Sequence, residues 1–189
     1  MAGKPLSDDV IEKIADVFRA HGYEGATLTR ISEATGLKRG SLYHHFPGGK
    51  EDMARAVMEM LGERVRAELL SPLSQADAPP RERLQQWADA VVRFYSGGKK
   101  NCMLGAMVLS GGDAPLKMEL RLGVTGWINA IAQVLQDAGA TKAEARKRAR
   151  HSVERIQGSL IVARALGDSG TFAREVRDLP NILLAGLET

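Results

Sequence analysis

Apolar residues recur at helical spacing along nearly the whole chain, and this pattern is the strongest constraint on its fold. Near the N-terminus, Val10, Ile11, Ile14, Val17 and Phe18 fall on one face of a helix with 3.6 residues per turn. No segment of the 189 residues sustains the period-two alternation of a half-buried strand. The pattern therefore predicts an all-α protein.

Capping residues, glycines and prolines divide this pattern into about nine helices. Ser7, Thr27 and Thr141 are suited to cap helix N-termini, and Gly22, Gly36 and the pairs at 97–98 and 111–112 to end helices. The predicted helices cover residues 8–21, 28–35, 38–45, 50–70, 81–95, 102–109, 115–138, 142–166 and 172–187. Residues 71–80 carry three prolines and are predicted to form a loop, and Pro180 is expected to kink the last helix or to mark a restart.

The composition is that of a soluble globular protein, with 44% hydrophobic and 26% charged residues. Cys102 is the single cysteine, which excludes an internal disulfide and fits a reducing compartment. Residues 1–10 lack the apolar core of a signal peptide, and no stretch approaches the roughly 18 apolar residues of a membrane span. We therefore expect a cytoplasmic protein.

The positive charge is concentrated in one short segment. The net charge of the whole chain is only +3. Between Ala26 and Lys50, however, there are four basic residues and one acidic residue, Glu33, so this segment carries a net charge of +3 and the rest of the chain has a net charge of zero. A local excess of this kind indicates a surface that faces phosphates.

The same segment has the organisation of a helix-turn-helix. Two helices of about two turns meet at Gly36, which can adopt the positive φ of a sharp turn. Helices this short do not persist alone, so they must pack on the first helix. The residues expected to face inward are Leu28, Ile31, Ala34, Leu37, Leu42 and Phe46, with Ala34 small enough for the two helices to cross closely.

The outward side chains of the second helix of this pair suit DNA. Lys38 and Arg39 place cations at its start, and Ser41, Tyr43 and His44 add hydrogen-bond donors. Lys50 begins the following helix, where free backbone amides and its ammonium could converge on one phosphate.

The segment from Thr27 to Lys50 resembles the DNA-binding domain of the TetR/AcrR family of transcriptional regulators. The resemblance rests on the Thr27/Thr29 start, Ala34-Thr35-Gly36, Gly40-Ser41-Leu42-Tyr43-His44-His45-Phe46, and the lysine after the turn. The Phe-Pro-Gly-Gly-Lys-Glu turn at 46–51 is similar to the branch that contains regulators of drug-resistance and flavonoid-responsive genes.

This resemblance implies a ligand-responsive repressor that is released from a palindromic operator by a small apolar effector. Phosphate contacts are then expected from Thr27, Thr29, Tyr43, His44 and Lys50, and contacts with base edges from Arg39, Gly40 and Ser41. Lys38 departs from the family, in which many members have Ser or Thr as the helix cap.

The resemblance also implies two domains, residues 1–50 for DNA binding and 51–189 for ligand binding and dimerisation. The residues expected to line a pocket are Trp87, Phe94, Met103, Met107 and Trp127, although each taken singly also fits an ordinary core position. The residues expected at a homodimer interface are Val153, Ile156, Leu160, Phe172, Val176, Leu179 and Leu183.

Other functions find less support in the sequence. The adjacent His44 and His45 point in different directions on a helix, so we predict no metal site and no cofactor. A nucleotide loop ending at Lys50 would need Gly at position 44 and Ser or Thr at 51, where the chain has His and Glu. The basic run 142–155 fits a solvated helix face. The alternative from another class is a helical small-molecule binding module or enzyme without DNA binding.

Overall fold

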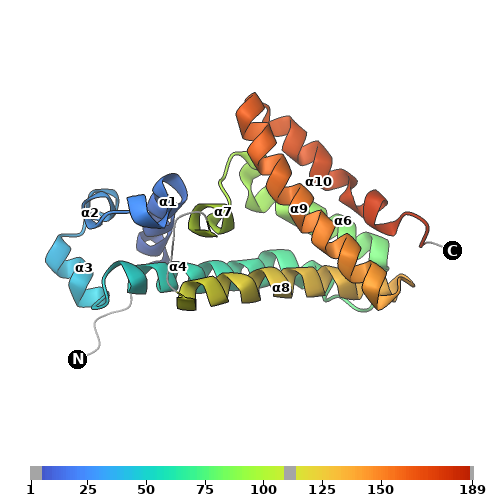
Figure 1. The fold of residues 1–189 in the computed structure, drawn as a ribbon, viewed down its shortest axis with the longest axis horizontal. Coiled ribbons are helices and arrows are strands. Elements are labelled where there is room, and N and C mark those ends of the chain that lie inside the picture. The colour runs from blue at the N-terminus through green and yellow to red at the C-terminus, as the bar shows by residue number, and fades with distance from the viewer. Residues whose placement is uncertain (1–5, 109–113, 188–189) are drawn as a thin grey trace. The chain divides into compact units, whose positions relative to one another are not determined.

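The computed structural model describes residues 6–108 and 114–187, and the chain divides into two compact units. The first unit comprises Met1–Glu63 and Cys102–Arg121, and the second comprises Arg64–Asn101 and Leu122–Thr189. Helices make up all the regular secondary structure of the described residues (Figure 1). The prediction of an all-α fold is confirmed.

The first unit contains the four N-terminal helices, α1 (Asp8–Gly25), α2 (Leu28–Thr35), α3 (Arg39–His45) and α4 (Lys50–Arg64). It also contains α7 (Met103–Val108) and the beginning of α8 (Ala114–Asp137). α1 packs against both α2 and α7, and α2 packs against α3 (Figure 1). At Gly22, with φ of +67° and ψ of 178°, the backbone of α1 leaves helical geometry at the residue where the sequence predicts the helix end.

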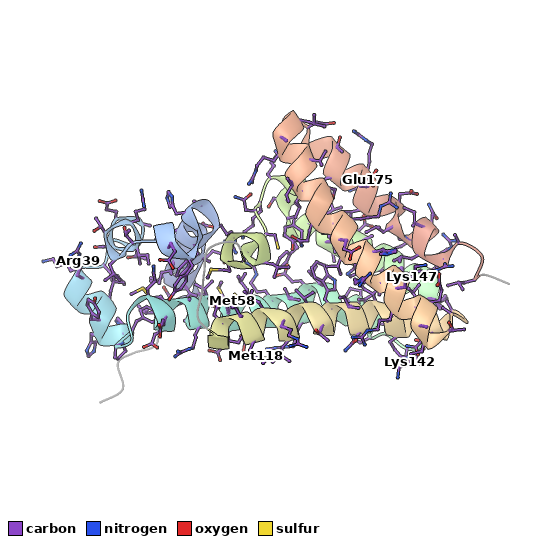
Figure 2. All side chains as sticks on the ribbon, viewed as in Figure 1. Arg39, Met58, Met118, Lys142, Lys147 and Glu175 are labelled. Atoms are coloured by element: carbon purple, nitrogen blue, oxygen red, sulfur yellow. The ribbon has the colours of Figure 1, made fainter. Side chains whose placement is uncertain are left out.

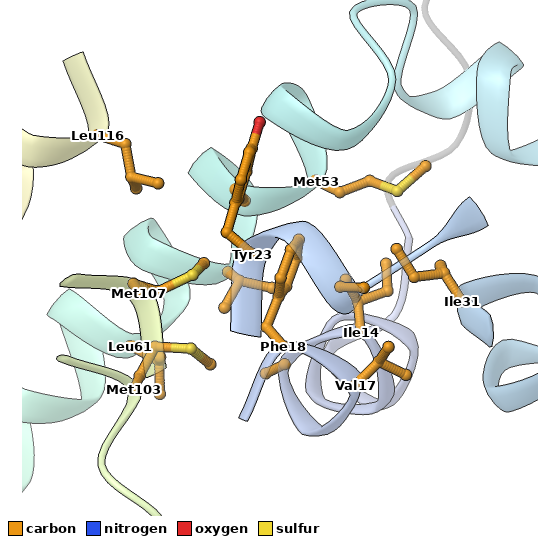
Figure 3. Packing of buried hydrophobic residues seen from close by; sticks show 14 of the residues in the cluster. Ile14, Val17, Phe18, Tyr23, Ile31, Met53, Leu61, Met103, Met107 and Leu116 are labelled. Atoms are coloured by element: carbon orange, nitrogen blue, oxygen red, sulfur yellow. The ribbon is translucent and has the colours of Figure 1, made fainter. Parts of the chain in front are cut away.

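One hydrophobic cluster holds this unit together (Figure 3). Ile14 and Phe18 of α1 lie among Ile31 of α2, Leu42 of α3 and Met53 of α4, and all five side chains are fully buried. The two-turn helices α2 and α3 each contribute one such anchor, Ile31 and Leu42. Because burying an aliphatic side chain contributes about 1.5–3 kcal/mol, packing on α1 and α4 is what stabilises the short pair.

The second unit contains the π-helix η1 (Val65–Leu70), α5 (Ser71–Leu73), α6 (Pro80–Phe94), the 3₁₀-helix η2 (Ser96–Gly98), α9 (Lys142–Leu166) and α10 (Ser169–Leu184), with the rest of α8. α10 packs against α9, α6 and η2. Gly98, with φ of +96°, allows α10 to approach η2 closely, because a Cβ there would lie 2.8 Å from the Cβ of Phe172. The Phe172 ring also meets Tyr95 edge-on, with centroids 5.8 Å apart.

A buried arginine ties three elements of the second unit together. Arg83 of α6 is 4% exposed, and its Nε donates a 2.9 Å hydrogen bond to the carbonyl of Leu73, which also accepts from Nη2. Its Nη1 donates to Oδ2 of Asp137, at the end of α8, over 2.7 Å. Burial raises the pKa of Asp137, but hydrogen bonds from Gln133 and Arg83 and the charge of Arg83 outweigh it and leave the pKa below its ordinary value.

The predicted helices correspond to α1–α4 and α6–α10, with local differences that include the following. The predicted loop at 71–80 begins with the helical turn α5, which continues the π-helix η1, and the last helix starts at Ser169. α10 runs through Pro180 without a restart, because its buried ring packs inside the unit and one missing hydrogen bond does not end a packed helix. Ala34 is exposed rather than inward-facing. The predicted stop at 111–112 lies outside the described residues.

Candidate nucleic-acid interface

The corner between α2 and α3 is held by side-chain hydrogen bonds as well as by glycine. Gly36 has φ of +73° and ψ of 3°, the left-handed conformation. Ser32 Oγ donates to the carbonyl of Leu37 over 2.6 Å, and Thr35 Oγ1 donates to the carbonyl of Ile31 over 2.7 Å. Thr35 Oγ1 also accepts from the backbone N–H of Leu37. The start of α3 is therefore fixed relative to α2.

α3 buries one face and exposes the other. Leu42 is fully buried and Phe46, just after the helix, is 6% exposed. On the outer side, Lys38, Arg39, Gly40, Tyr43 and His44 are exposed, and Ser41 is half-buried. The Arg39 side chain projects outward from the start of α3 (Figure 2). The residues of α3 that are predicted to contact DNA are therefore accessible to solvent, Ser41 in part.

Thr27 and Thr29 have intramolecular partners in the structure. Thr27 is the N-cap of α2, and its Oγ1 accepts a 3.3 Å hydrogen bond from the backbone N–H of Arg30. Thr29 Oγ1 accepts a 2.6 Å hydrogen bond from Nη2 of Arg39, across the corner. Thr29 thus orients the guanidinium that lies first on α3.

Lys50 lies at the start of α4, after a turn closed by Asp52, whose Oδ2 accepts from the backbone N–H of Gly48 over 2.6 Å. The Lys50 ammonium is 3.7 Å from Oε2 of Glu24 and 4.4 Å from the centroid of the Tyr23 ring. Our sequence analysis missed Tyr23 and Glu24. The available signal was an aromatic residue and an acid directly after the helix-breaking glycine at 22, which does not reveal that they meet a lysine far along the chain.

The five predicted pocket residues are divided between the two units. Met103 and Met107 belong to the hydrophobic cluster of the first unit (Figure 3). Trp87, Phe94 and Trp127 belong to the second, where the two indoles are buried and Phe94 is half-buried. Neither unit therefore contains all five residues, so they do not line one pocket within a single unit.

The two tryptophans among these five residues have an unusual hydrogen-bonding state. The Nε1 atoms of Trp87 and Trp127 are buried and have no acceptor among the described residues. Nε2 of Gln157, also in the second unit, is in the same state. A buried donor without a partner costs about 1–3 kcal/mol, so an acceptor placed beside any of these three N–H groups would be favourable.

All seven residues predicted at a dimer interface are buried within the single chain. Val153, Ile156, Leu160, Phe172, Val176, Leu179 and Leu183 are each at most 7% exposed. They pack the helices of the second unit and leave almost no surface for a second copy. The same two helices instead expose Ile161, Val162, Leu166 and Ile182, at 72%, 49%, 69% and 36%. Ile182 also borders an open groove of about 460 Å³ lined by α9 and α10.

Within residues 6–108 and 114–187, no three His, Cys, Asp or Glu side chains lie close enough together to bind a metal ion. No helix in the same ranges combines the length and apolarity that a membrane crossing requires.

Comparisons with known proteins agree with this geometry. The family described as "Bacterial regulatory proteins, tetR family" matches residues 10–57. The family described as "Transcriptional regulator LmrA/YxaF-like, C-terminal domain" matches residues 80–176, about half of the chain.

One relative and one solved structure extend the likeness over nearly the whole chain, and another relative over about half of it. The HTH-type transcriptional regulator LmrA of Bacillus subtilis (strain 168) is 22% identical over 93% of this chain and 95% of LmrA. The HTH-type transcriptional repressor DhaR of Mycobacterium sp. (strain GP1) is 30% identical, over 56% of this chain and only 52% of DhaR. A TetR transcriptional regulator from Legionella pneumophila has the same fold, with a TM-score of 0.82, 22% identity and coverage of 96% of this chain and 98% of that one. The chain therefore belongs to the TetR family of bacterial helix-turn-helix transcriptional regulators, in the group with an LmrA/YxaF-like C-terminal domain, and its relatives are regulators rather than enzymes.

Proposed function

We propose that the protein is a dimeric repressor that binds palindromic operator DNA through α3 and releases it when a small molecule binds the C-terminal region. The observation that carries this proposal is the exposed outer face of α3, which begins with Arg39 directly after the Gly36 corner. Residues 1–50 then act as the DNA-binding domain and 51–189 as the ligand-binding and dimerisation domain. Such a protein works beside the chromosome, in the cytoplasm.

The exposed residues divide by the kind of DNA contact they can make. Side chains at the N-terminal end of a recognition helix reach base edges, which gives Arg39 and Ser41 the reading role. Lys50, at the start of α4, offers an ammonium and free backbone amides to a phosphate. Phosphate contacts set affinity and its salt dependence, whereas base contacts set sequence preference.

Two substitutions test this division by quantitative gel shift. Lys50→Ala should weaken binding to every duplex and reduce the slope of log K against log salt by roughly one unit. Arg39→Ala should instead lower affinity for the operator more than for unrelated DNA, by roughly 1–3 kcal/mol. An unchanged slope for Lys50→Ala, or an equal loss on all sequences for Arg39→Ala, would refute the corresponding role.

We place the dimer contact on the exposed apolar residues of α9 and α10. Ile161, Val162, Leu166 and Ile182 are large apolar side chains in contact with solvent in the single chain. A second copy covering them through a two-fold axis would remove this surface from water. To read successive turns of B-DNA, the two α3 helices of such a dimer must lie roughly 34–36 Å apart.

The effector that we propose is a small, mainly apolar molecule that also carries hydrogen-bond acceptors. The second unit supplies buried aromatic surface, and the indole N–H groups of Trp87 and Trp127 lack acceptors there. A carbonyl or ether oxygen would satisfy such donors, so Trp87→Phe or Trp127→Phe should weaken binding of acceptor-bearing effectors only. To act as an inducer, the molecule must bind the DNA-free state more tightly than the DNA-bound state. Ligands that raise thermal stability but never change operator affinity would contradict this coupling.

The competing function is a helical small-molecule binding module without DNA binding. The two functions separate in one gel shift with duplex DNA from the neighbourhood of the chain's own gene. Retardation that is lost in high salt and depends on sequence supports the repressor. Absence of retardation at every salt concentration supports the module.

A further inference from the structure

Lys50, the residue that we assign to phosphate, is already paired inside the protein. Its ammonium lies 3.7 Å from the Glu24 carboxylate and 4.4 Å from the centroid of the Tyr23 ring. Tyr23 is 8% exposed and stacks on Phe18, with ring centroids 6.0 Å apart, so the ring is fixed in the core of the first unit. Glu24 is the next residue, and its side chain is 72% exposed.

We propose that Glu24 competes with DNA phosphate for Lys50 and holds operator affinity below the value that the remaining contacts would give. The proposal rests on the proposed function, because it requires Lys50 to meet a phosphate. In this proposal Glu24 sets the strength of DNA binding although it does not itself contact the DNA.

The competition follows from the geometry of the three side chains. The buried Tyr23 ring attracts the ammonium and keeps it beside the chain segment that carries Glu24. A phosphate that approaches Lys50 therefore comes within a Debye length, about 8–10 Å, of the carboxylate, and like charges at that range repel. Binding must both weaken the pair with Glu24 and overcome this repulsion.

Removing the charge of Glu24 tests the proposal. Glu24→Gln keeps the size and exposure of the side chain, so the melting temperature should stay unchanged. Affinity for operator and for unrelated duplex should rise alike, by roughly two- to fivefold at moderate salt, which is the strength of an exposed ion pair. The salt dependence should become steeper, since Lys50 then contributes its full charge.

Glu59→Gln is the matched control for net charge. Glu59 is exposed on the same helix as Lys50, nine residues further on, which is about 13 Å along the helix axis. It makes the same change in net charge without touching the pair. Equal tightening by Glu59→Gln and Glu24→Gln would reduce the effect to overall charge and overturn the proposal, as would a Glu24→Gln protein that binds DNA no more tightly than the parent.

The Lys50→Ala background separates the two hypotheses. In the Lys50→Ala protein, Glu24→Gln should tighten DNA binding no more than Glu59→Gln does, because the ammonium for which Glu24 and phosphate compete is absent. If Lys50→Ala alone leaves DNA affinity unchanged, the phosphate role of Lys50 fails and the competition fails with it. If Lys50→Ala weakens binding but Glu24→Gln has no effect in the parent protein, the competition alone is wrong.

Discussion

Gly36 shows how a single residue places the DNA-facing helix. Its φ of +73° lies in the left-handed region, and an added Cβ would meet no atom within 4 Å. The requirement for glycine is therefore a matter of backbone conformation and not of space. Because α3 begins three residues later, a change of backbone conformation here would rotate Arg39 and the rest of the exposed side of α3 away from their positions relative to α2.

We expect Gly36→Ala to lower the free energy of unfolding by about 1–2 kcal/mol, the cost of a left-handed non-glycine residue. Gly40→Ala is the control, since Gly40 lies inside α3 with no positive φ and equally open space. Alanine in a helix should there be neutral or stabilising by up to about 1 kcal/mol. Urea unfolding of both variants measures the difference, and equal stabilities would refute the special conformation of Gly36.

The pair of Arg83 and Asp137 predicts a pH dependence. The pKa of Asp137 in the folded chain lies below its ordinary value of 3.8, so its ionised form stabilises the fold above that pH. The contribution is lost as the pH falls through the lower, folded pKa. Asp137→Asn should thus lower the free energy of unfolding by about 1 kcal/mol between pH 5 and 7. The difference in stability between the variant and the parent should narrow below about pH 4.

The exposed pair of Asp89 with Arg177 is the control for this measurement. It also links two helices, over 3.2 Å, but both side chains are more than half exposed. Exposed pairs contribute little, so Asp89→Asn should change stability by less than about 0.5 kcal/mol. A difference in stability between Asp137→Asn and the parent that did not narrow at all as the pH fell below about 4 would show that the charge of Asp137 is not what stabilises the fold.

At the scale of helices, the N-caps are local enough to be predicted and tested. Thr141 Oγ1 accepts a 3.3 Å hydrogen bond from the backbone N–H of Glu144 and opens the 25-residue helix α9, as the sequence predicted. Thr141→Ala should lower the free energy of unfolding by about 1 kcal/mol, whereas Thr141→Ser should be nearly neutral. Thermal melts of the two variants decide the matter, and indistinguishable melts would contradict the cap.

The sequence predicted the type and order of the helices because periodicity and capping act within a few residues. It did not predict which neighbour covers each apolar face. Val153 and Phe172 were predicted at a dimer interface, but both side chains are buried within the single chain. No local sequence pattern distinguishes the π-helix η1, and the sequence analysis predicted one α-helix over 50–70 that includes it.

The candidate site followed the same division. Arg39, Tyr43 and Lys50 could be proposed as DNA contacts from the sequence, because the helix-turn-helix spacing lies in one continuous segment. The partners of Lys50 could not be predicted, since Tyr23 and Glu24 approach it only through the packing of α1 on the core. A hydrogen bond such as that from Arg39 to Thr29 likewise needs the angle between two helices.

At the scale of the whole molecule, the proposed dimer depends on the exposed face of α9. Leu166→Glu combined with Ile161→Glu should convert a dimer to monomers in sedimentation, because each places a charge in the apolar contact. Leu122→Glu is the control, since Leu122 is 63% exposed but lies on α8. Monomers should also lose most operator affinity, as each retains one half-site contact. A dimer that survives the double substitution would place the interface elsewhere.

The most direct test of the account is selection of binding sites from a random duplex DNA library by the full chain. The account predicts enrichment of a two-fold symmetric sequence whose half-sites lie about one helical turn apart, roughly 10–10.5 base pairs. Arg39→Ala should enrich a different or relaxed half-site, whereas Lys50→Ala should enrich the same one more weakly. No enrichment at low salt, or the same half-site with Arg39→Ala, would contradict DNA reading by α3.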